Sequence, residues 1–210
     1  MATLTMNSTL DMRVLELLTA RLCHELSGPI AAVGNGVELL AEGDADFADE
    51  ALALVTHSAR RAANRLQFYR FAYGFGGAAA AAGPAPCELA ARFFEGLPVA
   101  CDYAERVRAL PLDRQKLGCN LLVVGAEALV RGGRLALDVT CAGVQLDAVG
   151  ETVLLPPEQA AALRLEPWAG ALTTRTVNAY FAGLLARACG WRLAAATEPG
   201  RIRLSSIACA

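Results

Sequence analysis

The feature that most constrains this fold is a long apolar stripe close to the N-terminus. From Ser8 to about Leu40, large aliphatic residues recur at steps of three and four, within roughly 120° of a helical circumference. The residues of this stripe are Leu15, Leu18, Leu22, Leu26, Ile30, Val33, Val37 and Leu40. Ser8 and Asp11 form an S-x-x-D signal for a helix start. The pattern predicts one long helix with a single apolar face.

A second helix is predicted directly after the first. The turn-like segment EGDAD at 42–46 ends the first helix. A weaker stripe follows, through Phe47, Ala51, Leu54, Ser58, Ala62, Leu66 and Tyr69, and predicts a helix from about Phe47 to Tyr73. Two helices alone enclose little core. We therefore expect residues 1–76 to form a helical hairpin that pairs with a second copy of the chain as a dimeric four-helix bundle.

The rest of the chain has a mixed pattern. A segment rich in glycine, alanine and proline spans 74–86, and we place a linker at 77–86. In residues 87–210, helical patterns at about 87–95, 113–131, 157–163 and 173–189 alternate with strand-like runs at 134–141, 143–149, 152–155, 191–196 and 201–208. This mixture predicts an α/β sandwich with helices on one face of a mixed sheet. The expected fold class is α+β.

Composition and charge argue against several classes of protein. No charge-free apolar stretch approaches the roughly 20 residues of a membrane-spanning helix. The N-terminus has neither a basic start nor an apolar signal core, which favours a cytoplasmic protein. A net charge of −2 argues against nucleic-acid binding. The 7 cysteines contain no CxxC pair, so we expect them to be reduced, mostly buried and not metal ligands.

The chemistry is expected at His24. At about 100° per residue, His24 lies roughly 180° from the centre of the first stripe, so its imidazole should be exposed in the middle of a helix. Its neighbours on that face are mostly small and comprise Leu17, Ala20, Arg21, Ser27, Gly28, Ala31 and Asn35. Small neighbours, with Leu17 as an exposed apolar contact, indicate a surface on which another protein docks.

Pro29 strengthens this interpretation. Proline inside a helix lacks an N–H and clashes with the preceding turn, which frees the Glu25 carbonyl and costs about 3 kcal/mol. Gly28, Gly34 and Gly36 add to that cost, and local inconsistency of this kind is expected at functional sites. A neutral imidazole can carry a phosphoryl group reversibly. Glu25 is a candidate to orient that imidazole or to accept its proton.

Two segments resemble parts of sensor histidine kinases. His24-Glu25-Leu26-Ser27-Gly28-Pro29-Ile30 resembles the kinase H-box, usually H-E-L-R-T-P-L, whose histidine is the phosphoacceptor of a dimeric helical hairpin. Asn120-Leu121-Leu122, Ala126 and the RGGRL run at 131–135 resemble the N-L-L-x-N-A…G-G-x-V stretch of the kinase ATP-binding domain. The resemblance implies the fold of that domain for residues 87–210.

Three nucleotide-binding motifs of those kinases are missing. The second asparagine, which helps hold Mg-ATP in kinases, is replaced by Val124 or Gly125, depending on the alignment. Residues 140–144 lack the aspartate of the D-x-G-x-G motif. Residues 172–177 stand where G-x-G-L-G would wrap the phosphates, and they contain no glycine.

An H-box hairpin followed by such a degenerate domain resembles the ChpT family of bacterial histidine phosphotransferases over nearly the whole chain, including 58–61, 68–74 and 131–133. The resemblance implies a homodimeric phosphorelay protein of two-component systems. Such a protein would take a phosphoryl group on His24 from the receiver domain of a hybrid kinase and pass it to response regulators of the cell cycle. Mg²⁺ would come with the receiver, and this chain would bind neither ATP nor metal. The receiver is expected to dock through Leu17, Arg21, Ser27, Gly28, Ala31 and Asn35.

Two other functions remain open. An ATP-dependent histidine kinase core with an atypical nucleotide site would label His24 from ATP, whereas a non-catalytic receiver-binding scaffold would still function after His24→Gln. We interpret His57 as a solvated residue rather than a second acceptor. The arginines of the second helix either steer acidic receivers or solvate the hairpin, and both alternatives stay open; they are Arg60, Arg61, Arg65 and Arg70. We interpret Trp168 and Trp191 as core or cap residues rather than ligand contacts.

Overall fold

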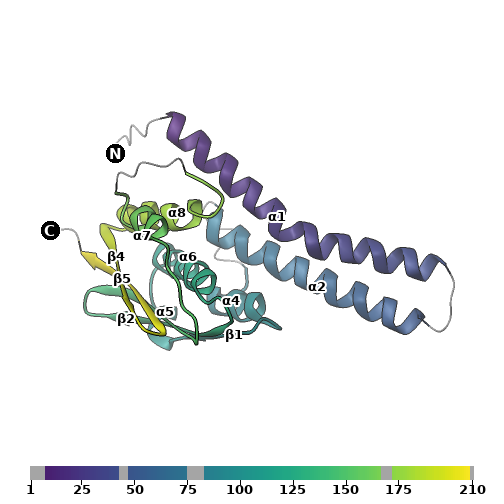
Figure 1. Cartoon of the computed structure of the whole chain (residues 1–210). Coiled ribbons are helices and arrows are strands. Elements are labelled where there is room, and N and C mark those ends of the chain that lie inside the picture. Colours follow the sequence, from purple (N-terminus) through teal and green to yellow (C-terminus); the bar gives the residue numbers. More distant parts are fainter. Residues whose placement is uncertain (1–7, 43–46, 75–82, 167–171, 209–210) are drawn as a thin grey trace.

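A computed structural model describes residues 8–42, 47–74, 83–166 and 172–208. Helices α1 (Ser8–Ala41) and α2 (Ala48–Tyr73) form an antiparallel hairpin that extends away from the part of the molecule containing the sheet (Figure 1). Both helices start and end within one residue of the predicted positions. Most of the predicted turn at 42–46, and the side chains of the Ser8 capping signal, lie outside the described residues.

The remaining elements form an α/β part, which follows the hairpin in the chain. Its helices and strands are α4 (Pro86–Phe94), β1 (Val99–Tyr103), α5 (Glu105–Arg108), α6 (Leu112–Ala128), β2 (Gly133–Thr140), β3 (Gly143–Val149), α7 (Pro157–Leu163), α8 (Val177–Ala188), β4 (Trp191–Glu198) and β5 (Arg201–Ala208). The sheet has the order β1-β2-β3-β5-β4, in which β1 and β2 are parallel and the other pairs antiparallel. The predicted α+β fold with a mixed sheet is confirmed.

One strand was missed and one strand prediction is wrong. Strand β1 was not predicted, because its five residues alternate only between exposed and half-buried positions. The run at 152–155 is no strand, because Val153 forms only an isolated bridge with Leu129, at the end of α6. Helix α8 also begins later than predicted. Its first turn is preceded by a turn in which the Thr173 N–H donates to Thr176 Oγ1 at 3.1 Å.

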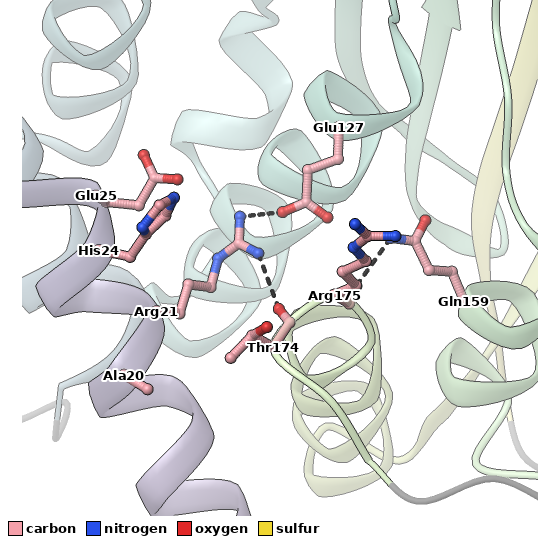
Figure 2. A pocket seen from close by; sticks show the side chains of 8 residues that line it. All are labelled: Ala20, Arg21, His24, Glu25, Glu127, Gln159, Thr174 and Arg175. Atoms are coloured by element: carbon pink, nitrogen blue, oxygen red, sulfur yellow. Dashed lines mark hydrogen bonds and ion pairs between the residues drawn. The ribbon is translucent and has the colours of Figure 1, made fainter. Parts of the chain in front are cut away.

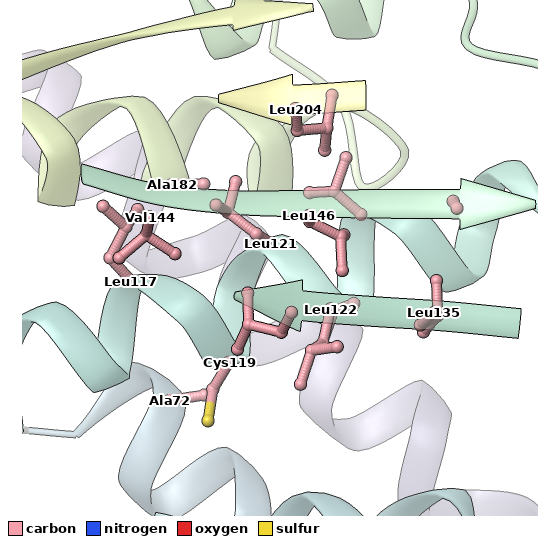
Figure 3. Close-up of a cluster of buried hydrophobic side chains, with 14 of the residues drawn as sticks. Ala72, Leu117, Cys119, Leu121, Leu122, Leu135, Val144, Leu146, Ala182 and Leu204 are labelled. Atoms are coloured by element: carbon pink, nitrogen blue, oxygen red, sulfur yellow. The ribbon is translucent and has the colours of Figure 1, made fainter. Parts of the chain in front are cut away.

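Helix α6 is the centre of the core. Its residues from Gln115 to Gly125 are all buried, and in Figure 3 its leucines meet Leu135, Leu146 and Leu204 of the strands. Gly125 permits this close packing, since a Cβ there would lie 2.5 Å from Leu146 Cδ2. The opposite face of the sheet is polar: on it, Asp147 accepts hydrogen bonds from the Nε atoms of Arg201 at 3.0 Å and Arg203 at 2.9 Å. Helices therefore cover one face only, as predicted.

The hairpin is fastened to the α/β part at its base. The Nδ2 of Asn120, a fully buried residue, donates to the carbonyl of Ala72 at the end of α2 and to that of Lys116, both at 2.9 Å. Tyr73 Oη donates to Asn178 Oδ1 of α8 at 3.0 Å. A small apolar cluster joins the start of α1 to α8 and consists of Val14, Leu17, Leu18 and Val177.

Away from this base, the apolar stripes of the hairpin are largely open in the single chain. Ile30 is 58% exposed and Val37 is 52% exposed, and Phe47 and Leu66 are also exposed. Gly36 faces the other way, toward α2, where a Cβ would lie 2.6 Å from Val55 Cγ2. The contact between α1 and α2 therefore covers only part of each apolar stripe, and the rest of both stripes is exposed in the single chain.

The cysteines and tryptophans give a mixed outcome. All six described cysteines are free, but the expectation that most are buried is wrong: only Cys119 is buried, and Cys23 and Cys141 are exposed. Trp191 lies in the core as predicted, whereas Trp168 lies outside the described residues. Among the helices that the structure describes, we find none that is long and apolar enough to cross a membrane.

Candidate functional site

His24 lies on α1 between two hollows and is exposed to both. On one side, a cleft of about 530 Å³ separates α1 from the α/β part (Figure 2); it is lined by Ala20, Arg21, His24, Glu25, Glu127, Gln159, Thr174 and Arg175. On the other side, a groove of about 480 Å³ runs between α1 and α2; it is lined by His24, Glu25, Ser27, Gly28, Pro29, Ala32, His57, Ser58, Arg61 and Arg65. The imidazole is therefore accessible from either direction.

In the cleft, Arg21 connects α1 to the α/β part. Its Nη2 forms an ion pair with Glu127 of α6, and its Nη1 donates to the Thr174 carbonyl at 3.3 Å. The two paired side chains are only 13% and 22% exposed. Burial raises the pKa of Glu127 to about 7, although the positive charge of Arg21 opposes this shift.

In the groove, Arg65 of α2 repairs the defect that Pro29 creates. Because Pro29 has no N–H, the Glu25 carbonyl lacks its normal partner in the helix. Arg65 Nη1 donates to this carbonyl at 3.1 Å and also forms an ion pair with the Glu25 carboxylate. The Arg65 guanidinium lies 5.9 Å from the centre of the Phe93 ring. Arg65 is therefore a structural residue of the hairpin, and not a free steering charge.

Glu25 is adjacent to the imidazole in Figure 2, but its carboxylate is engaged elsewhere. The ion pair with Arg65 directs it toward α2, and within the described residues we find no hydrogen bond between Glu25 and His24. Its role as orienter or base stays a prediction.

The structure corrects two of the predicted docking residues. Leu17 is not an exposed contact, because α8 packs against the first turns of α1 and leaves Leu17 only 6% exposed. Arg21 is not free on the surface, because it is paired with Glu127. A helical wheel cannot show either contact, since both partners are distant in sequence.

The remaining predicted docking residues are accessible. Ser27, Gly28, Ala31 and Asn35 are exposed, and Ser27 Oγ donates to the Cys23 carbonyl at 2.7 Å. A Cβ on Gly28 would meet nothing within 4 Å. Of these four, Ser27 and Gly28 line the groove. Of the predicted docking residues, the exposed ones therefore all lie on the C-terminal side of His24, while Ala20 on the other side lines the cleft.

Several residues of the site were not predicted. Glu127, Gln159, Thr174 and Arg175 reach the cleft from the α/β part. The one available signal was Glu127, a lone carboxylate in the apolar run at 121–130. His57 is exposed, as predicted, yet it lines the same groove as His24.

The positions that match kinase nucleotide motifs serve structural purposes here. Asn120 is buried and donates to two carbonyls, while Val124 and Gly125 are buried in the core. Residues 140–144 close the β2–β3 hairpin, where the Val144 N–H donates to Ser206 Oγ at 2.7 Å. Gly143 has a φ of 135° there, and a Cβ would lie 2.3 Å from Ser206 Oγ. At these positions, the side chains and backbone therefore contribute to the packing of the α/β part.

Comparisons with known proteins agree with one another. The family model for the histidine phosphotransferase C-terminal domain matches residues 87–201. The chain is 32% identical over 197 residues to the protein phosphotransferase ChpT of Brucella abortus (strain 2308). That alignment covers 89% of this chain and 90% of that protein. A solved structure of a bacterial phosphotransferase is similar with a TM-score of 0.76 and 30% identity, covering 93% of this chain and 96% of that one. These two matches include the hairpin as well as the sheet.

Proposed function

This chain belongs to the ChpT family of histidine phosphotransferases, and we propose that it relays a phosphoryl group through His24, from the receiver-domain aspartate of a hybrid kinase to the aspartates of response regulators. The observation that carries this proposal is the exposure of His24 between two hollows, in a helix that contains Pro29, with small residues beside it. An acceptor in such a place can be approached by a receiver domain of another protein.

The chemistry is a reversible displacement at phosphorus. A neutral imidazole nitrogen of His24 attacks the aspartyl phosphate, the P–O bond breaks as a P–N bond forms, and the aspartate leaves as a carboxylate. The reacting atoms must approach to about 3–3.5 Å in line. Ser27, Gly28 and Ala31 leave space for this approach. We propose that Mg²⁺ enters with the receiver, where it neutralises the phosphoryl charge, and that this chain contributes no cofactor.

We further propose that the chain does not use ATP. Support comes from Asn120, which is fully buried and whose Nδ2 donates to two backbone carbonyls inside the core. Thr173 and Thr176 form a hydrogen-bonded turn before α8, at the position where a kinase would wrap the phosphates. The phosphoryl group would then have to come from another phosphoprotein.

A homodimer completes the proposed assembly. The exposed stripe residues on α1 and α2 are aliphatic or aromatic and face away from the α/β part; they include Leu15, Ile30, Val37, Phe47, Leu54 and Leu66. An exposed apolar band of this length is typical of a surface covered by another chain. Pairing two hairpins through these bands would form a four-helix bundle with His24 on its outside.

The test is phosphoryl transfer to purified protein. With a phosphorylated receiver as donor, we expect label on wild-type chain and none on His24→Gln, while the variant keeps its circular dichroism spectrum because an exposed residue contributes little to stability. With labelled ATP and Mg²⁺ alone, we expect no label. Label from ATP would identify a kinase core instead, and unchanged signalling by His24→Gln would identify a scaffold.

A further inference from the structure

The Arg21–Glu127 pair lies one helical turn before His24 and faces it. Residues three apart on a helix are neighbours, with Cβ atoms about 5–6 Å apart. Figure 2 shows the Arg21 guanidinium between the His24 ring and the Glu127 carboxylate. All three side chains line the same cleft. The guanidinium therefore has Glu127 on one side and the proposed acceptor on the other.

Arg21 has binding capacity that its present partners do not use. A guanidinium has five N–H donors in a planar fork. Here Nη2 binds Glu127 and Nη1 binds the Thr174 carbonyl, while Nε is buried and has no hydrogen-bond partner. Nη1 and Nη2 each carry two N–H donors, and these are the groups that an anion on His24 would contact.

Phosphorylation of His24 would add negative charge beside the two ion pairs that flank it. Before transfer, Arg21 and Arg65 match Glu127 and Glu25 in two ion pairs. A phosphoryl group adds about −1.5 to −2 charges near neutral pH. Glu127 and Glu25 would then stand beside a like charge. Glu127 is the carboxylate that would give up its ion pair more easily, since burial already disfavours its charged form.

We propose that Arg21 changes partners during the relay: it pairs with Glu127 while His24 is free, and with the phosphoryl group once His24 carries one. This inference rests on the proposed function of His24. No covalent bond changes in the exchange, because one ion pair replaces another. Arg21 would thereby stabilise the phosphorylated histidine, and Glu127 would limit that stabilisation by competing for the same guanidinium.

The experiment measures how the phosphoryl group distributes at equilibrium between a purified receiver and His24. In Arg21→Gln we expect the share on His24 to fall about tenfold, the size of one charge-assisted hydrogen bond. In Glu127→Gln we expect it to rise. If Glu127 acts by competing for Arg21, its substitution should have much less effect when Arg21 is already Gln, so the double variant should be clearly non-additive.

A matched pair provides the control. Arg13 and Glu16 form an exposed ion pair on the same helix, and Arg13→Gln should leave the distribution unchanged. Circular dichroism of each variant checks folding. Two results would overturn the partner exchange while the proposed function stays intact, because His24 would still accept the phosphoryl group in both. In one, the effects of Arg21→Gln and Glu127→Gln are additive; in the other, neither substitution changes the distribution. Absence of any transfer to wild-type His24 would overturn both.

Discussion

Glu127 lies in an apolar stretch of α6, where a carboxylate is costly unless it is paired. Its pKa is raised from 4.5 to about 7 because it is buried, with Arg21 opposing the shift. Between pH 4.5 and about pH 7, Glu127 therefore binds more protons in the native state than in the unfolded state. The contribution of this residue to stability is therefore fully present below about pH 4.5 and is lost as the pH rises toward 7.

Replacement of Glu127 by glutamine should remove this pH dependence. We expect the free energy of unfolding of wild-type protein to fall relative to that of Glu127→Gln between pH 5 and pH 7.5, by about 1–3 kcal/mol. Urea unfolding of both proteins at the two pH values measures the difference, in which all other titrating groups cancel. A constant difference, or one of opposite sign, would show that Glu127 stays ionised throughout.

Pro29 and Arg65 show what could be predicted at the level of residues. The sequence alone predicts that Pro29 leaves the Glu25 carbonyl without a donor. It does not predict that Arg65 replaces the donor, because Arg60, Arg61, Arg65 and Arg70 were equally plausible on the second helix. Which of them faces α1 depends on the rotation of α2 against it.

At the scale of elements, the long helices were predicted well because their apolar spacing is repeated over many turns. Short elements were not, since β1 and the run at 152–155 each offer only a few residues of pattern. The wheel of α1 also placed Leu17 wrongly, because one helix can be covered by different neighbours along its length. Of the proposed docking residues, those on the C-terminal side of His24 are the exposed ones.

This corrected face makes a prediction for Ala31, an exposed residue about two turns beyond His24. Ala31→Trp should keep the fold but reduce receiver affinity and slow phosphoryl transfer at least about tenfold, since a displacement near 1 Å at the reacting atoms costs roughly 100-fold. Ala91→Trp, at an exposed alanine of α4 that lines neither hollow, is the control. Near-wild-type binding and transfer in Ala31→Trp would mean that the receiver approaches from elsewhere.

The open stripe of the hairpin makes a second prediction at this scale. Val37→Asp should convert the proposed dimer to a monomer, because a charge would have to be buried between two hairpins. Val130→Asp, at a similarly exposed valine of the α/β part, should leave the dimer intact. Sedimentation velocity distinguishes the two states. A dimer that survives Val37→Asp, or a monomeric wild type, would refute the bundle.

At the scale of the whole molecule, the site is made by contacts between segments far apart in the chain. His24, Pro29 and the small residues beside them were identified from a single helix. The cleft was not, since Arg21 and Glu127 meet only because the base of the hairpin is fixed on α6 and α8. The anchor is Asn120, which matches the first asparagine of the kinase N-L-L-x-N-A stretch.

The position of Asn120 allows a test of the kinase alternative, because a structural role and a role as a ligand of Mg-ATP need different chemistry. Its Nδ2 donates to the carbonyls of Ala72 and Lys116, so this position needs a hydrogen-bond donor inside the core. A ligand of Mg-ATP would instead have to present an oxygen, which aspartate supplies as well as asparagine does. Asn120→Asp keeps the size of the side chain but directs a carboxylate at two carbonyl oxygens.

We expect Asn120→Asp to lower the free energy of unfolding by about 3 kcal/mol or more, since it leaves an uncompensated charge in the core. Asn35→Asp, at an exposed position of α1, should change it by no more than about 0.5 kcal/mol. Urea unfolding at neutral pH measures both. Because Asn120 links α2 to α6, its loss should also release the hairpin, so amide hydrogens near Ala72 should exchange faster in the variant than in wild type. If Asn120→Asp were as stable as wild type and bound Mg-ATP, the residue would be a nucleotide ligand, and the kinase alternative would replace the phosphotransfer proposal.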